Sequence, residues 1–372
     1  MPFRIALLAL VFLALGAVPA AAAERSVPRG WLGVQADGIF DGPDPVAVPE
    51  WGKMATAGVE SVRLAVFWAN VAPTPDALDL RLYDEQVSRA AQAGLRVVPV
   101  VQRVPQWAAR IPNDAASPPS EGRGTRAYAD FLRALVARYG PSGTLWSERP
   151  ELPRLPIRAW QVWNEPNLRD FWSVQPFARS YVALLRAADR ALERADPFST
   201  TVLSGLVNDS PGALRQIYRA GGRGAFDAVA LHPYTRRPRD VVRLVERARL
   251  VMRRAGDRRL ALWVTELSWT SAGRRATGGF GIETSEAGQA RRLTEAVTRL
   301  ARSRRRLGIA RVYWYTWLST ETPGSDYTFD FAGLRRLRGG RVVDVPALRA
   351  FTRVARRLQG CAKVPGDARR CR

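Results

Sequence analysis

Three residue types are scarce in this sequence, and two of them limit the chemistry that the protein can perform. The only cysteines are Cys361 and Cys371, so a disulfide between them would hold the C-terminus and not the core; two free thiols on a frayed tail are the alternative. His232 is the single histidine, and no group of His, Cys and Asp has metal-ligand spacing. We therefore expect no catalytic metal and no cofactor.

Lysine is the third scarce residue type, because nearly all of the positive charge comes from arginine. The net charge is +23, yet lysine occurs only at Lys53 and Lys363. Basic proteins often bind nucleic acid, but here the arginines are spread through every predicted helix and do not interleave with aromatic residues. We expect no nucleic-acid partner. The skew is typical of a GC-rich genome, and an association with an anionic cell-wall polymer stays open.

Long apolar runs are also missing, except at the N-terminus. Arg4 precedes an almost wholly apolar run that ends at Val18, and small residues follow Pro19. A short positive region, a short apolar region and a small-residue cleavage site are typical of a secretory signal peptide. The pattern predicts a signal peptide over residues 1–23 and secretion. The run is short for a spanning helix, so we expect no stable membrane insertion of the mature chain.

Residues 24–358 are predicted to form one domain, followed by a basic tail over residues 359–372. Short apolar runs alternate with segments of helical period, such as the stripe from Phe177 to Leu192. Eight such runs alternating with helices predict an α/β fold, a (β/α)8 TIM barrel with long βα loops. A doubly wound open sheet would need a Gly-rich turn after the first strand, and none follows Gln35. The predicted strands are Trp31–Gln35, Ser61–Phe67, Arg96–Val101, Ile157–Asn164, Thr200–Leu206, Phe226–Leu231, Leu260–Thr265 and Ala310–Tyr315.

Two glutamates follow predicted strands at the end where barrel enzymes carry their chemistry. Glu165 comes directly after the fourth strand and Glu266 directly after the seventh. A carboxyl group at the end of an apolar strand is costly unless it is paired or used. Retaining glycoside hydrolysis needs two carboxyl groups about 5–5.5 Å apart, one protonated and one ionised. The fourth and seventh strands face each other across the barrel mouth, so these two acids are the candidate pair.

The residues around both glutamates resemble a known family. The segment Trp163–Leu168, WNEPNL, resembles the acid/base motif of clan A glycoside hydrolases, and is closest to family 39, which contains β-xylosidases and α-L-iduronidases. Thr265 and Glu266 resemble the nucleophile site of that clan. The likeness extends roughly from Trp31 to Phe351. It implies a retaining O-glycosyl hydrolase acting on an oligo- or polysaccharide, with Glu165 as acid/base, Glu266 as nucleophile and Asn164 bound to the sugar 2-hydroxyl.

Further residues acquire roles from the same resemblance. Arg63, in the second strand, matches the arginine that keeps the nucleophile ionised. His232 and Tyr234, after the sixth strand, match a His-x-Tyr element in which the tyrosine hydrogen-bonds to the nucleophile. A sole histidine is more often a satisfied structural residue than a catalyst, so His232 is either structural or a hydrogen-bond partner of the sugar, in preference to a base. Trp314, in the eighth strand, matches the tryptophan that forms the floor of the sugar site.

Aromatic side chains and one departure complete the sequence-based expectations. Sugar rings stack on aromatic faces, so Trp68 and Trp172 are further candidates, with core packing as the alternative for at least half of the 12 tryptophans. Family 5 enzymes carry a histidine after the third strand, where this chain has Gln102 and Arg103. A catalytically silent barrel that binds cell-wall or acidic glycan remains the alternative function. It is disfavoured because both glutamates are present.

Overall fold

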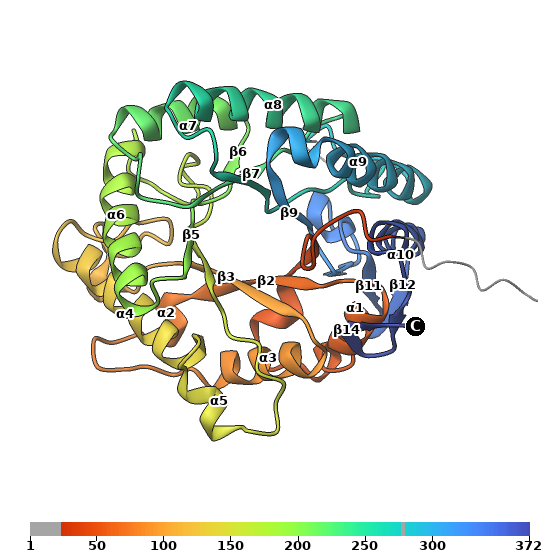
Figure 1. The fold of residues 1–372 in the computed structure, drawn as a ribbon, viewed down its shortest axis with the longest axis horizontal. Helices are drawn as coiled ribbons and strands as arrows, with labels where there is room; N and C mark the ends of the chain where they lie inside the picture. The colour runs from red at the N-terminus through yellow and green to blue at the C-terminus, as the bar shows by residue number, and fades with distance from the viewer. Residues whose placement is uncertain (1–23, 277–279) are drawn as a thin grey trace, which may run out of the picture.

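The computed structural model describes residues 24–276 and 280–372, so the predicted signal peptide lies outside the described residues. Parallel strands close into a ring, and helices surround that ring on the outside (Figure 1). The (β/α)8 barrel predicted from the alternating patterns is therefore confirmed. Its strands are β1 (Leu32–Ala36), β2 (Ser61–Phe67), β3 (Arg96–Gln102), β4 (Ala159–Val162), β5 (Thr200–Val202), β6 (Leu206–Val207), β7 (Ala228–His232), β8 (Ala261–Val264) and β9 (Ile309–Trp314).

The fifth position of the barrel is divided between two short strands. β5 pairs with β4 and, at Val202, with β7, whereas β6 pairs with β7 through Leu206 and Val207. The sequence predicts one strand over Thr200–Leu206, and the structure interrupts it before Gly205. Pairing of β1 with both β2 and β9 closes the ring.

The helices cover the outer face of the barrel because each has one apolar stripe to bury. α9 shows how the chain sets the ends of such a helix. The Ser285 hydroxyl accepts a hydrogen bond from the Gly288 amide, and Gly308 adopts a left-handed conformation (φ 66°) at the C-terminal end. The helices are α1 (Glu50–Thr56), α2 (Trp68–Val71), α3 (Arg81–Gln92), α4 (Arg123–Tyr139), α5 (Thr144–Glu148), α6 (Ala178–Ala195), α7 (Ser210–Arg219), α8 (Pro238–Arg254), α9 (Glu286–Leu307) and α10 (Pro346–Gln359).

Strand alternation divides the apolar side chains into two clusters. Outward residues such as Val62 and Leu64 pack against the helices, while a small inner cluster fills the barrel and includes Trp263 and Tyr313. Gly33 is needed there, since a Cβ at this position would lie 2.6 Å from the Tyr313 ring. Polar side chains fill the space above the inner cluster.

Loops and 3-10 turns complete the mouth, where the βα connections meet. The long loop after β3 contains the turn η3 (Gln106–Ala108), and α4 begins at Arg123. After β9 the chain forms a small sheet beside the mouth. Its strands are β10 (Leu318–Thr320), β11 (Arg335–Arg338) and β12 (Arg341–Asp344), and the turn η4 (Thr328–Phe331) lies between β10 and β11.

The C-terminal tail forms a hairpin at the opposite end of the barrel. β13 (Lys363–Val364) pairs with β14 (Asp367–Cys371), and a disulfide joins Cys361 to Cys371. Lys363 Nζ lies 2.7 Å from an oxygen of buried Glu60, which precedes β2 and also pairs with Arg25 at 2.6 Å. Burial acts to raise the pKa of Glu60, but hydrogen bonds from these two cations lower it overall. Both ends of the described chain are thus tied to one carboxylate.

No helix within residues 24–276 and 280–372 is long and apolar enough to cross a membrane.

Candidate functional site

Arg63 stands at the centre of the polar cluster that fills the barrel mouth. Its side chain is 1% exposed, because β2 directs it inward above the inner apolar cluster. A buried guanidinium is tolerated only when its donors are satisfied. Its donors reach four acceptors on three other strands or their ends: Gln35 and Gln161 at 2.6 Å, Glu266 Oε1 at 2.7 Å and Asn164 Oδ1 at 2.8 Å.

The end of β4 departs from regular strand geometry, and this departure points Asn164 towards Arg63. Trp163 and Glu165 both have left-handed backbone conformations, with φ of 69° and 42°. Such values are rare outside glycine and persist where the surroundings enforce them, which is common at functional sites. Trp163 consequently turns outward and packs edge-on against Trp172 at 5.2 Å, while Asn164 reaches the mouth.

Glu266 is held by two donors from different strands. Oε1 accepts a hydrogen bond from Arg63, and Oε2 accepts one from the Tyr234 hydroxyl at 2.7 Å. Hydrogen bonds donated to a carboxylate favour its ionised form. Glu266 is 7% exposed, so its carboxylate is buried and the positive charge of Arg63 compensates it.

His232 lies between the two glutamates. Its Nδ1 is 2.5 Å from Glu165 Oε1, and its Nε2 is 3.5 Å from Glu266 Oε1. The ring fits only because residue 205 is glycine: a Cβ there would stand 1.9 Å from Nε2. Nδ1 and Glu165 Oε1 share one hydrogen bond whose donor depends on the tautomer, while the buried Nε2 has no hydrogen-bond partner among the described residues.

Burial raises the pKa of both glutamates, so their hydrogen-bond partners are what distinguish them. Burial raises the pKa of Glu165 to about 8, and the Arg63 charge only partly opposes it. Burial lowers the pKa of His232 to about 3, which leaves the ring neutral near pH 7. Burial also raises the pKa of Glu266, and the charges of His232 and Arg63 oppose this rise only in part. Glu266 accepts hydrogen bonds from Arg63 and Tyr234, which favour its ionised form, whereas Glu165 contacts only the neutral ring of His232 among these groups.

The three groups form a tight cluster. Ligand atoms of Glu165, His232 and Glu266 all lie within 4.8 Å of one another, close enough to share one small group or to hold a cation. The spacing of these residues in the sequence did not indicate a metal site. A cation already occupies one side of the cluster, because the Arg63 guanidinium binds the Glu266 oxygen that faces His232. That positive charge opposes a second cation in the same place.

The structure places the three candidate tryptophans in the core instead of at the mouth. Trp68, Trp172 and Trp314 are each 1% exposed. Trp68 packs among aromatic rings of the outer shell, and Trp314 hydrogen-bonds to the Ala332 carbonyl at 3.2 Å. Trp314 is buried because side chains alternate along a strand, and it shares the outward face of β9 with Val312. Sugar stacking on these rings is therefore not available in this structure.

Tyr315 and Asp37 belong to the candidate site, although the family resemblance indicated neither of them. Tyr315 follows β9 on its inward side, is only partly buried, and hydrogen-bonds to Asp37. Burial raises the pKa of Asp37, whereas the Gln35 side chain and the Arg63 charge lower it. The signal was present in the sequence: counting alternate positions from the inward Tyr313 leads to Tyr315.

Gln102 and Arg103 end β3 where family 5 enzymes carry a histidine. Gln102 is buried, and Arg103 adopts a left-handed conformation (φ 62°). The Arg103 guanidinium lies over the Phe171 ring at 5.4 Å, and it donates to the Ala115 carbonyl at 2.8 Å. Arg103 therefore lies beside the segment that follows β4.

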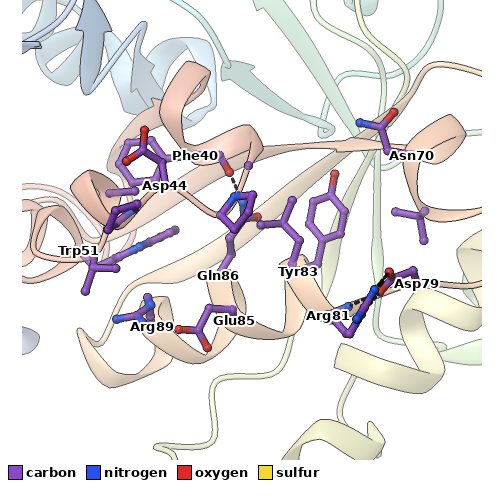
Figure 2. A pocket seen from close by; sticks show the side chains of 17 residues that line it. Phe40, Asp44, Trp51, Asn70, Asp79, Arg81, Tyr83, Glu85, Gln86 and Arg89 are labelled. Atoms are coloured by element: carbon purple, nitrogen blue, oxygen red, sulfur yellow. Dashed lines mark hydrogen bonds and ion pairs between the residues drawn. The ribbon is translucent and has the colours of Figure 1, made fainter. Parts of the chain in front are cut away.

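A large cavity lies away from this cluster. It has a volume of ≈ 590 Å³ and is lined by residues of α3 and of the segment that precedes and includes α1. Figure 2 shows the side chains that line it. Its walls are mainly apolar, with Phe40, Trp51 and Tyr83 among the lining residues. Neither glutamate of the pair lines it. The converging polar groups at the mouth, and not the size of this hollow, identify the candidate site.

No protein-family model matches the chain, and no curated protein matches it either. Solved structures do match. A family 39 glycoside hydrolase from Bacteroides cellulosilyticus WH2 is 20% identical, with a TM-score of 0.68 over 90% of this chain and 64% of that one. A monomeric beta-xylosidase from Caulobacter crescentus CB15 is 18% identical, with a TM-score of 0.62 over 89% of this chain and 69% of that one. A glucosidase from Croceicoccus marinus is 16% identical, with a TM-score of 0.64 over 91% and 69%.

These matches confirm the likeness to clan A and family 39 glycoside hydrolases at the level of the fold. The chain spans less than two thirds of the length of the Bacteroides enzyme. Fold alone does not determine activity, so the chemistry must be argued from the residues at the mouth.

Proposed function

We propose that this protein is a glycoside hydrolase that cleaves O-glycosidic bonds of an oligo- or polysaccharide with retention of anomeric configuration. One observation carries the proposal: two buried carboxyl groups within 4.8 Å of each other have opposite hydrogen-bonding environments. Glu165 contacts a neutral histidine, and Glu266 contacts an arginine and a tyrosine. This arrangement supplies one proton donor and one ionised nucleophile, as double displacement requires.

In the first step, a Glu266 oxygen attacks the anomeric carbon and forms a covalent ester. The bond from that carbon to the leaving oxygen breaks as Glu165 transfers its proton to this oxygen. Arg63 and Tyr234 hold the attacking carboxylate in one orientation. His232 keeps the Glu165 carboxyl group in place and remains neutral itself.

In the second step, Glu165 acts as the base. It takes a proton from water, the hydroxyl attacks the anomeric carbon, and the ester bond to Glu266 breaks. Asn164 would assist both steps. Its Oδ1 accepts from Arg63, which leaves the amide nitrogen as the donor towards the sugar 2-hydroxyl. Tyr315, and not Trp314, is the aromatic residue on which the reacting sugar would rest.

Product stereochemistry tests this proposal directly. The mature protein would be incubated with a panel of aryl glycosides, and the first product formed would be followed by proton NMR. We expect the anomer of the substrate to appear first, and we expect Glu266→Gln to release no aryl group while melting near the wild-type temperature. First appearance of the opposite anomer would replace retention with inversion. Turnover by Glu266→Gln would remove this residue from the mechanism.

We also propose that residues 1–23 direct export and that cleavage occurs near Ala23. The signal pattern supports this, and so does the disulfide between Cys361 and Cys371, because such bonds persist in oxidising compartments. N-terminal sequencing of protein recovered from the culture medium would test it. A mature chain that still begins at Met1 would contradict it.

A further inference from the structure

Two large aromatic side chains beside the mouth are mostly exposed. Phe280 is 64% exposed and Tyr327 is 56% exposed, although they come from different loops, after β8 and after β10. Both pack against Phe329, with ring centroids 5.6 Å apart in each pair. We call these three residues the aromatic patch. Adjacent exposed rings of this kind mark a binding surface more often than isolated ones do.

The aromatic patch is continuous with the catalytic cluster. The Phe329 ring lies 5.5 Å from Tyr234 and 5.4 Å from Tyr315, edge-on in both cases. Tyr234 in turn donates its hydroxyl to Glu266. An unbroken series of ring contacts therefore leads from the nucleophile to the exposed faces of Phe280 and Tyr327.

Hydrogen bonds fix the two loops that carry the patch. The Glu283 carboxylate accepts from the Phe280 amide at 2.9 Å and from the Thr328 hydroxyl at 2.8 Å, so it joins one loop to the other. The Ser325 hydroxyl donates to Asp330 at 2.6 Å across the base of η4. Both acids are thereby engaged within the loops. The exposed rings are held in place before any ligand arrives, which lowers the entropic cost of binding.

The chemistry of the patch indicates what it binds. Aromatic faces stack on the C–H faces of pyranose rings, and the Tyr327 hydroxyl can exchange hydrogen bonds with sugar hydroxyls.

The contacts of Phe329 also show on which side of the mouth the aromatic patch lies. Phe329 contacts Tyr234 and Tyr315, which lie against Glu266 and Asp37, whereas the aromatic residues behind Glu165 form a separate group around Trp163. Groups around the nucleophile hold the glycone, and groups around the acid face the leaving group.

We propose that Phe280, Tyr327 and Phe329 form a subsite for a second sugar ring on the glycone side of the cleaved bond. This inference rests on the proposed function and makes it more specific. The preferred substrate then carries at least two sugars before the cleaved bond, so it is an oligosaccharide chain and not a single terminal sugar.

Aryl glycosides with one or two sugars separate this subsite from the reaction centre. Wild type, Tyr327→Ala and Phe280→Ala would be assayed on a nitrophenyl monoside and on the matching nitrophenyl bioside. We expect the ratio of kcat/KM for bioside over monoside to fall about 5- to 30-fold in each variant, as for the loss of one stacked ring. Phe198→Ala is the matched control, since Phe198 is 79% exposed and packs on Arg158 far from the mouth. This control should keep the wild-type ratio.

An unchanged ratio would overturn the subsite. If neither rate changes, the rings do not hold a sugar, and if both rates fall equally, the rings act only as scaffolding. Calorimetry of xylotetraose and cellotetraose with Glu266→Gln, alone and combined with Tyr327→Ala, separates this result from failure of the proposed function. Weaker binding in the double variant supports the subsite even if no glycoside is turned over. Equal binding, or none in either variant, rejects it.

Discussion

Substitution of Glu165 by glutamine should change how the stability of the protein depends on pH. Burial raises the pKa of Glu165 from 4.5 to about 8 in the folded chain. In the unfolded chain this carboxyl group loses its proton near pH 4.5, but in the folded chain it does so only near pH 8. Folding therefore binds a proton between these two values. The stabilising contribution is complete below about pH 4.5 and is lost as the pH rises through about 8.

The size of this effect follows from the shift. A difference of about 3.5 pH units corresponds to roughly 5 kcal/mol, at about 1.4 kcal/mol per unit. Glu165→Gln has no proton to lose and still places an amide beside His232 Nδ1. Between pH 4 and pH 9, the free energy of unfolding of the variant should increase by roughly 5 kcal/mol relative to that of wild type. For a chain of about 350 residues this is a relative gain in Tm of about 7 °C.

Thermal melts at pH 4 and pH 9 would measure this difference. Glu193→Gln, at an exposed position on α6, is the control and should follow the wild-type pH dependence. The pH profile of wild-type kcat/KM gives a second readout, because loss of the Glu165 proton should set the basic limb near pH 8. An equal offset between Glu165→Gln and wild type at both pH values would refute the proton assignment on which the mechanism depends.

Three other substitutions test the cluster in different ways. Glu165→Ala should lose about 10²–10⁴-fold in activity on substrates with poor leaving groups, and azide should partly restore turnover of activated ones; retention of full activity on both would refute its acid role. Arg63→Met should lower the free energy of unfolding by about 3–5 kcal/mol in urea titrations, because Glu266 is left as an uncompensated buried charge; a change below about 1 kcal/mol would contradict the ion pair. Gly205→Ala should displace His232 and reduce kcat, and a wild-type kcat would show that the ring position does not matter.

Much of this architecture could be predicted from the sequence because it depends on periodic patterns. Apolar strands alternating with helices predicted the barrel, and both glutamates were found by their positions at strand ends. The motif resemblance assigned the floor of the sugar site to Trp314, but inward and outward positions alternate, and Tyr315 reaches the mouth. Left-handed residues such as Trp163 could not be predicted, since no local pattern marks a conformation that only the packed surroundings enforce.

The tie between Glu60 and the C-terminal hairpin has a practical consequence for handling the protein. The hairpin lies at the end of the barrel opposite the mouth, where the Ala368 amide donates to the Ala93 carbonyl just before β3 begins. If the protein is attached to beads or to a scaffold protein through Arg372, the mouth of the barrel should therefore face the medium. Trimming the tail to shorten such a linker would remove Lys363 from beneath the barrel and leave Arg25 as the remaining cation on a buried acid.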